Sequence, residues 1–160
     1  MDEFAVPAGF EQLWERVTAA EADEVPKTPT EELEAFMNGE MRSISFYQTL
    51  AGQCTGCARQ TLLRIMTDER RHLKMMQLEY FMRTGDSFVP AVPIPAEKTG
   101  VLAALREGFL AENETAAAYT AAGESRDGEL GEIYAEIAAD ERRHAGQLRE
   151  IIARSFTEQG

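Results

Sequence analysis

The two histidines of the chain lie in two copies of one five-residue motif. The sequence Asp-Glu-Arg-Arg-His occupies residues 68–72 and returns at residues 140–144. In each copy the histidine follows a glutamate by three residues, and residues three apart lie about one turn apart on the same face of a helix. Each copy can therefore offer one carboxylate and one imidazole to a metal ion. These four candidate ligands are Glu69, His72, Glu141 and His144.

The repeat extends beyond this motif. The shift of 72 residues that superimposes the two motifs also places Glu40 on Glu112 and Tyr47 on Tyr119. A charged, solvated helix face is the usual meaning of such a run, but five identities at one offset, which include both histidines, favour a duplicated unit. The period is longer than those of solenoid repeats. We therefore expect two copies of one helical hairpin, with Glu40 and Glu112 as two further ligands.

Proline and glycine divide the chain into four long stretches of strong helix-forming residues. Thr28, Pro29 and Glu31 are typical of a helix start with a capping box, and Gly85 is typical of a left-handed helix stop. Residues 123–128 are expected to form a turn. The expected helices run from Thr28 to about Leu50, from near Cys57 to near Thr84, from just after Gly100 to about Ala122, and from about Glu129 to Ser155.

Each expected helix carries its candidate ligand within a stripe of apolar residues. In the fourth helix, for example, Glu141 and His144 interrupt a stripe that contains Ile137 and Leu148 at helical spacing. A buried carboxylate without a partner costs several kcal/mol, as a rough estimate, unless it is protonated or a cation compensates it. The pattern therefore favours a metal site in the interior of the bundle.

The expected hairpins bring the candidate ligands to one level. In an antiparallel hairpin, residues at equal height are equidistant from the turn. The midpoint between positions 40 and 69 is 54.5, and the midpoint between positions 112 and 141 is 126.5. Both midpoints fall inside the expected turns. The proline-rich segment 85–99 can span roughly 50 Å when extended, enough to return along a helix of roughly 36 Å. We expect an all-α four-helix bundle of two repeated hairpins joined by a long crossover loop, whose second and third helices are parallel.

Four carboxylates and two imidazoles from four helices are the ligand set of a dinuclear carboxylate site. Oxygen-rich ligation suits Fe(II) or Mn(II) better than zinc. The neighbours of the ligands are candidates to support them through hydrogen bonds and charge: Asp68 and Asp140 toward the histidines, Arg71 and Arg143 toward these aspartates, and Tyr47 and Tyr119 toward the carboxylates. The tyrosines are equally compatible with ordinary core packing, and the aspartates with surface pairs to arginines.

Residues 30–155 resemble the ferritin-like superfamily, and within it rubrerythrins and bacterioferritins, because both halves carry a glutamate followed by Glu-x-x-His. The resemblance implies a ferritin-like bundle with two irons, manganese being possible, bridged by Glu69 and Glu141. It also implies a di-iron oxidoreductase that oxidises Fe(II) or reduces hydrogen peroxide or dioxygen. In this protein the six ligands would be the catalytic residues.

The chain departs from both branches. No four-cysteine rubredoxin segment follows Ser155, so the electron donor is unidentified. Thr115 stands where rubrerythrins carry an additional glutamate, and Glu114 is one place away. Arg70 stands where bacterioferritins carry the haem-ligating methionine, so we expect no haem. The pattern is most similar to stand-alone rubrerythrin-like proteins.

Cys54 and Cys57 form a Cys-x-x-Cys pair at the tip of the first hairpin. A thiol at the start of a helix has a lowered pKa, so a reversible disulfide is one interpretation. A thiol peroxidase or reductase that uses this pair is therefore one alternative function. Thr61 stands where comparable thiol peroxidases carry a histidine, which weakens the match. A non-catalytic metal-binding bundle is the second alternative.

The composition narrows the range of partners. A formal charge of −12 disfavours nucleic acid and anionic membranes, and no apolar run is long enough for a transmembrane helix. With no secretory signal at the start and only two cysteines, we expect a cytoplasmic protein. We expect residues 28–156 to form the bundle and residues 1–27 to form an extension with a short docking helix. We also expect the protein to be a homodimer.

Overall fold

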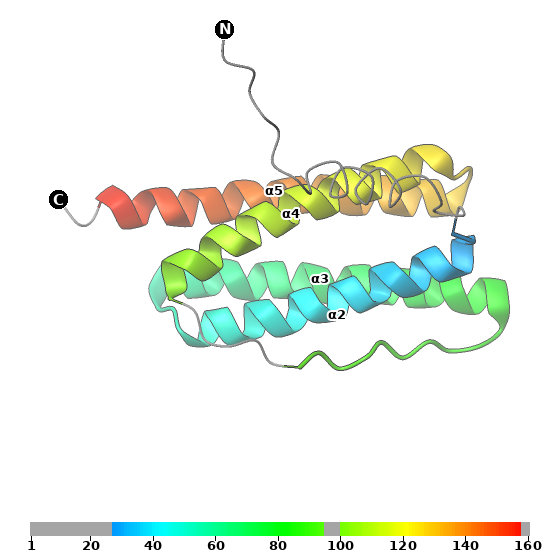
Figure 1. Ribbon diagram of the computed structural model, residues 1–160, viewed down its shortest axis with the longest axis horizontal. Coiled ribbons are helices and arrows are strands. Elements are labelled where there is room, and N and C mark those ends of the chain that lie inside the picture. The colour runs from blue at the N-terminus through cyan, green and yellow to red at the C-terminus, as the bar shows by residue number, and fades with distance from the viewer. Residues whose placement is uncertain (1–26, 95–99, 158–160) are drawn as a thin grey trace, which may run out of the picture.

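The chain folds into four long helices in a computed structural model that describes residues 27–94 and 100–157. In chain order the helices are α2 (Pro29–Gly52), α3 (Gly56–Thr84), α4 (Val101–Ser125) and α5 (Glu129–Thr157). The expected all-α four-helix bundle is thus confirmed (Figure 1). The extension expected over residues 1–27 lies outside the described residues apart from Lys27. None of the described helices is long and apolar enough to cross a membrane.

The bundle consists of two antiparallel hairpins, α2 with α3 and α4 with α5 (Figure 1). From the end of α3, residues 85–94 run back beside the first hairpin, and α3 and α4 point in the same direction. Two hydrogen bonds attach this crossover to the first hairpin: the Gln77 side-chain amide donates to Phe88 O at 3.2 Å, and Ala91 N donates to Asn38 Oδ1 at 2.9 Å. Both the duplicated hairpin and the crossover are therefore present.

Local signals account for the ends of two helices. At the start of α2, Glu31 N donates to Thr28 Oγ1 at 3.2 Å and Thr28 N donates to Glu31 Oε2 at 2.9 Å, which completes the capping box. At the end of α3, Gly85 has φ of 76°, and its N–H bonds to Phe81 O at 2.8 Å. Glycine adopts this left-handed conformation without steric cost.

The expected end of the third helix was wrong by three residues. Helix α4 continues through Gly123 to Ser125, so the turn to α5 is shorter than residues 123–128. A Cβ atom on Gly123 would lie 3.3 Å from Gly131 O and 3.4 Å from Ala135 N of α5. This glycine therefore allows two helices to approach closely, which sequence alone does not distinguish from a turn.

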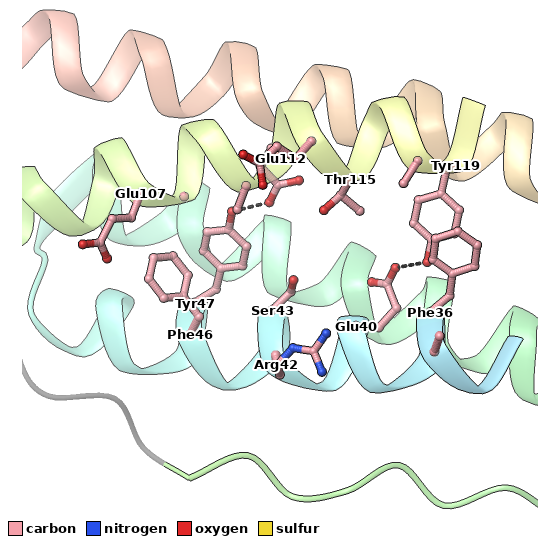
Figure 2. A pocket seen from close by; sticks show the side chains of 16 residues that line it. Phe36, Glu40, Arg42, Ser43, Phe46, Tyr47, Glu107, Glu112, Thr115 and Tyr119 are labelled. Atoms are coloured by element: carbon pink, nitrogen blue, oxygen red, sulfur yellow. Dashed lines mark hydrogen bonds between the residues drawn. The ribbon is translucent and has the colours of Figure 1, made fainter. Parts of the chain in front are cut away.

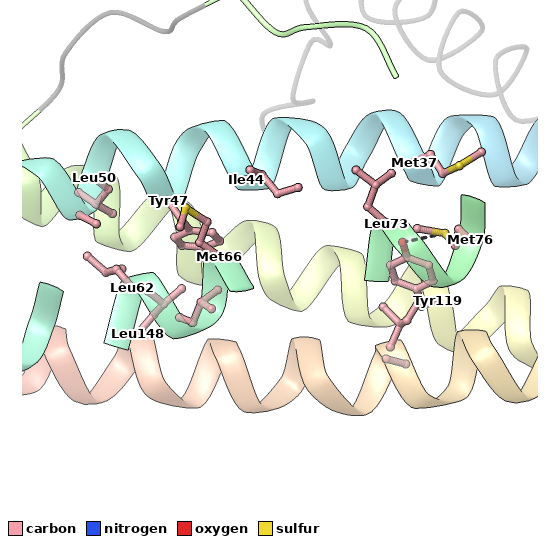
Figure 3. Close-up of a cluster of buried hydrophobic side chains, with 14 of the residues drawn as sticks. Met37, Ile44, Tyr47, Leu50, Leu62, Met66, Leu73, Met76, Tyr119 and Leu148 are labelled. Carbon is pink, nitrogen blue, oxygen red and sulfur yellow. Dashed lines mark hydrogen bonds between the residues drawn. The ribbon is translucent and has the colours of Figure 1, made fainter. Parts of the chain in front are cut away.

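Apolar side chains fill the bundle on both sides of its middle (Figure 3). One group includes Leu50, Leu62 and Leu148, and the other includes Met37 and Met76. All five side chains are almost completely buried. The middle level between these groups is occupied by charged residues, and the core on either side fixes the height at which the helices face one another.

Candidate metal centre

All six candidate ligands meet in the interior. Their ligand atoms form two groups, within each of which every atom lies within 4.8 Å of the others, and all six side chains are buried. The groups share Glu69 and Glu141. We call the group with Glu40 the Glu40 half-site and the group with Glu112 the Glu112 half-site. Their members are Glu40, Glu69, His72 and Glu141 in the first, and Glu69, Glu112, Glu141 and His144 in the second.

These residues present polar atoms that lack hydrogen-bond partners. Among the described residues, seven buried side-chain nitrogen or oxygen atoms are unpaired, and six of them belong to the six candidate ligands. Buried polar atoms in native proteins almost always have a partner, because an unpaired one loses its hydration without compensation. A pair of cations would satisfy these atoms. They are Glu40 Oε2, Glu69 Oε1, His72 Nδ1, Glu112 Oε2, Glu141 Oε1 and His144 Nδ1.

Both imidazoles direct Nδ1 toward carboxylates of the site. His72 Nδ1 lies 3.1 Å from Glu141 Oε1, and His144 Nδ1 lies 3.0 Å from Glu69 Oε1. Burial alone would lower the pKa of His144, but the neighbouring carboxylates of Glu112 and Glu69 outweigh it and raise this pKa to about 10. Without metal, the histidines therefore bind protons in the position where a metal ion would lie.

The carboxylates respond to the same crowding. Burial, together with the neighbouring Glu69, raises the pKa of Glu40 to about 8. Burial also raises the pKa of Glu141 to about 10, with the adjacent Glu112 as a further cause. Burial tends to raise the pKa of Glu69 as well, but the neighbouring Glu40 and the two histidines together outweigh burial and hold this pKa well below its usual range. A divalent ion must displace the protons on the other groups.

Two aspartates orient the histidines across the hairpin interface. His72 Nε2 of α3 lies 3.0 Å from Asp140 Oδ2 of α5, and His144 Nε2 of α5 lies 3.1 Å from Asp68 Oδ2 of α3. Such a contact at Nε2 fixes the ring orientation and leaves Nδ1 available as the ligand atom. The sequence pattern indicated these aspartates but not that each serves the histidine of the other hairpin.

The two arginines lie behind these aspartates. Arg143 donates to Asp140 and, at 2.8 Å, to Asp68, whereas Arg71 donates to Asp140 and, at 2.6 Å, to Glu136. Burial tends to raise the pKa of Asp140, but the hydrogen bonds from His72 and Arg143 outweigh burial and lower it. Glu136 was not among the expected residues, although it precedes Asp140 by four residues and so shares its helix face.

The two tyrosines also act across the hairpin interface (Figure 2). The Tyr47 hydroxyl of α2 donates to Glu112 of α4, and the Tyr119 hydroxyl of α4 donates to Glu40 of α2. Burial and the neighbouring carboxylates raise both tyrosine pKa values well above their ordinary value, so the hydroxyls remain protonated donors. Each contact occupies Oε1 of its carboxylate and leaves Oε2 facing the centre.

A cavity of about 480 Å³ lies between α2 and α4 and reaches the centre (Figure 2). Glu40 and Glu112 form part of its lining, together with the apolar side chains of Phe36 and Phe46. Thr115 faces the same cavity, at the position where rubrerythrins carry a further glutamate. A cavity of this size admits a small molecule.

The cysteines do not join this cluster. Cys54 is buried, Cys57 is exposed, and both are free thiols. Burial raises the pKa of the Cys54 thiol, which opposes formation of the nucleophilic thiolate. Cys57, at the start of α3, precedes Glu69 by twelve residues, a distance of about 18 Å along a helix.

A scan against protein-family models, a search of curated proteins and a search of solved structures each found no match for this chain. The resemblance to the ferritin-like superfamily therefore rests on the duplicated ligand pattern, together with a four-helix bundle whose buried Glu and His clusters are consistent with a dinuclear metal site.

Proposed function

We propose that this protein is a di-iron oxidoreductase of the rubrerythrin and ferritin type, which oxidises Fe(II) or reduces hydrogen peroxide or dioxygen. One observation carries the proposal: six unpaired polar atoms from four helices face one another in a single buried cluster. Carboxylate and imidazole atoms in these proportions suit Fe(II), with Mn(II) as the second candidate.

The membership of the two half-sites suggests a role for each ligand. Glu40 with His72 would hold one ion, and Glu112 with His144 the other. Glu69 and Glu141 belong to both half-sites and would bridge the ions. The charge of four ionised carboxylates is equal and opposite to that of two divalent cations, so metal binding would neutralise a cluster that is otherwise costly to bury.

In such a site, two irons supply the electrons that reduce a peroxide to water. The chain's own residues would prepare the site for this reaction. Tyr47 and Tyr119 hold two carboxylates in place through Oε1, and the aspartates hold the histidines through Nε2. The cavity between α2 and α4 would admit a small oxidant beside Glu40 and Glu112. An external donor, still unidentified, would return the electrons.

Metal content is the first test. Protein purified without oxygen and supplied with Fe(II) should bind two irons per chain, and it should consume hydrogen peroxide when a reductant is present. Glu141→Ala and His144→Ala should each lose bound iron and turnover, because each removes a ligand. Glu132→Ala, an exposed position on the same helix, should retain both. Unchanged iron content in the two ligand variants would refute the proposal.

Two alternatives predict different results. A thiol peroxidase would lose peroxide turnover when both Cys54 and Cys57 are replaced by Ser, whereas the di-iron route would retain it. A non-catalytic metal-binding bundle would show a higher melting temperature with metal but no turnover. The raised pKa of the Cys54 thiol counts against the first alternative.

A further inference from the structure

The cavity between α2 and α4 is larger and more apolar than hydrogen peroxide requires (Figure 2). Its volume is about 480 Å³, whereas a water molecule takes about 30 Å³ of the liquid. Most of its wall is apolar, and Phe36 and Phe46 stand ten residues apart on α2, about 15 Å along the helix. Cavities of this size and polarity are typical of sites for organic molecules.

Gly39 keeps the α2 wall of this cavity open. Beyond its chain neighbours and its own helix backbone, a Cβ atom on Gly39 would approach one atom within 4 Å, which is Arg42 Nη2 at 3.8 Å. Glycine destabilises a helix interior relative to alanine, and no close packing requires it here. Gly108 of α4 differs, because an added Cβ atom would lie 3.1 Å from Phe46 Cε1. The space above Gly39 is therefore room for a ligand.

The polar groups of the cavity favour a neutral ligand with one reactive end. Its inner wall includes Glu40 and Glu112, which are 2% and 3% exposed and belong to the candidate metal centre. The charged side chains of its outer lining, Arg42, Glu107 and Glu114, are exposed and have both signs. They provide no buried partner for a charged ligand. The cavity therefore suits an apolar body whose reactive group reaches the centre.

We propose that the substrate is an organic hydroperoxide whose apolar body occupies this cavity, in preference to hydrogen peroxide. The inference rests on the proposed peroxide reduction and names its substrate class. Reduction breaks the O–O bond of the hydroperoxide with two electrons, one from each of two Fe(II) ions, and with two protons from solvent. The products are water and an alcohol that retains the apolar body.

Binding is tested without metal or turnover. Cumyl alcohol, the product expected from cumene hydroperoxide, is titrated into metal-free protein in a calorimeter, and the wild type should bind one molecule per chain. Gly39→Leu fills the cavity and should bind the alcohol at least about tenfold more weakly, with no fall in melting temperature. Gly146→Leu places the same side chain on an exposed glycine of α5 with open space around it, and it should bind as the wild type does.

Selectivity is tested with iron-loaded protein and a reductant. In the wild type, kcat/KM should be higher for cumene hydroperoxide than for hydrogen peroxide. Ala111→Leu narrows the cavity from its α4 wall, and the ratio of the two kcat/KM values should fall at least about tenfold. Ala117→Leu, an exposed position on the same helix outside the cavity lining, should leave the ratio unchanged.

The outcomes distinguish the inference from the proposed function. A wild type that binds no cumyl alcohol, or that favours hydrogen peroxide, would overturn the inference while the di-iron function stands. A lower melting temperature of Gly39→Leu would also overturn it, because the protein itself would then fill the cavity. Failure of the wild type to bind iron would overturn the proposed function and the reduction of a hydroperoxide with it.

Discussion

Individual side chains tie the two hairpins together at the centre. Glu40 of α2 is held by Tyr119 of α4, and His72 of α3 is held by Asp140 of α5. The repeat-related contacts, from Tyr47 to Glu112 and from Asp68 to His144, have the same crosswise arrangement. Each of these four contacts joins one hairpin to the other, so the geometry of the centre depends on correct docking of the hairpins.

Removal of a tyrosine hydroxyl should therefore weaken metal binding without removing a ligand. Tyr47→Phe deletes the donor to Glu112 Oε1 in a buried site. We expect Mn(II) affinity to fall by about tenfold, as is common when a supporting contact behind a ligand is lost. Titration of the metal-free protein measures this. Tyr80→Phe is the matched control, because that hydroxyl donates to Glu34 outside the candidate metal centre, and an equal loss in both variants would contradict the prediction.

At the scale of the helices, residue spacing predicted most of what the structure contains. Thr28 and Gly85 give local signals that depend on their own backbone, and both helix ends lie where these signals indicated. The spacing of polar residues within apolar stripes likewise identified the six residues that meet in the interior. The spacing of residues within one helix is sufficient to predict which side chains face the interior.

Contacts between helices were harder to predict. Gly123 suggested a turn but allows the close approach of α5. The contact of Glu136 with Arg71 depends on how α5 faces α3, and the cavity wall at Phe36 depends on how α2 faces α4. The first of these features arises from the packing of α4 on α5 within the second hairpin, and the other two arise from the packing of one hairpin on the other. Patterns within a single helix encode neither kind of packing.

Two glycines of α5 should respond oppositely to the same substitution. A Cβ atom on Gly131 would collide with the Arg126 carbonyl oxygen and lie 3.1 Å from Gly123 O, so the backbone must shift. We expect Gly131→Ala to lower the free energy of unfolding by about 2 kcal/mol. Gly146 has open space around its Cβ position, so Gly146→Ala should raise stability by up to about 1 kcal/mol. Urea unfolding measures both, and a stable Gly131→Ala variant would disprove the close packing.

For the whole molecule, metal and protons should compete for the centre. The pKa of Glu40 is raised to about 8, and those of Glu141 and His144 to about 10. Groups with a raised pKa in the folded state stabilise the metal-free protein at low pH, and this contribution is lost as the pH rises through those values. Divalent ions replace the protons, so the increase in melting temperature caused by Mn(II) should be larger at about pH 8.5 than at about pH 6.

Thermal melts with and without Mn(II), under anaerobic conditions, test this dependence. Glu141→Gln provides the control, since it removes a titrating group and a ligand and should abolish most of the metal-induced increase. A metal-induced increase that is independent of pH in the wild type would contradict the competition.

The outer surface of the first hairpin exposes large apolar side chains. Met82 near the end of α3 is 72% exposed, and Val92 and Ile94 of the crossover are 86% and 92% exposed. Leu78 and Phe81, on the same turns of α3 as Met82, are also exposed. Leu78, Phe81 and Met82 lie at helical spacing on α3, and exposed apolar residues that adjoin one another mark interaction surfaces. A second copy of this chain is the partner that the expected homodimer requires.

We therefore predict that the crossover and the end of α3 form the dimer interface. The wild type should elute with twice the 17.8 kDa mass of one chain in light-scattering chromatography. Met82→Glu combined with Val92→Glu should shift it to the monomer mass, because dimerisation would then bury unpaired charges. Phe156→Ser alters an exposed apolar residue of α5 instead, and it should leave the dimer intact. A monomeric wild type, or a dimer that survives the double substitution, would show that this surface has another role, while metal binding inside the bundle should be the same in every variant.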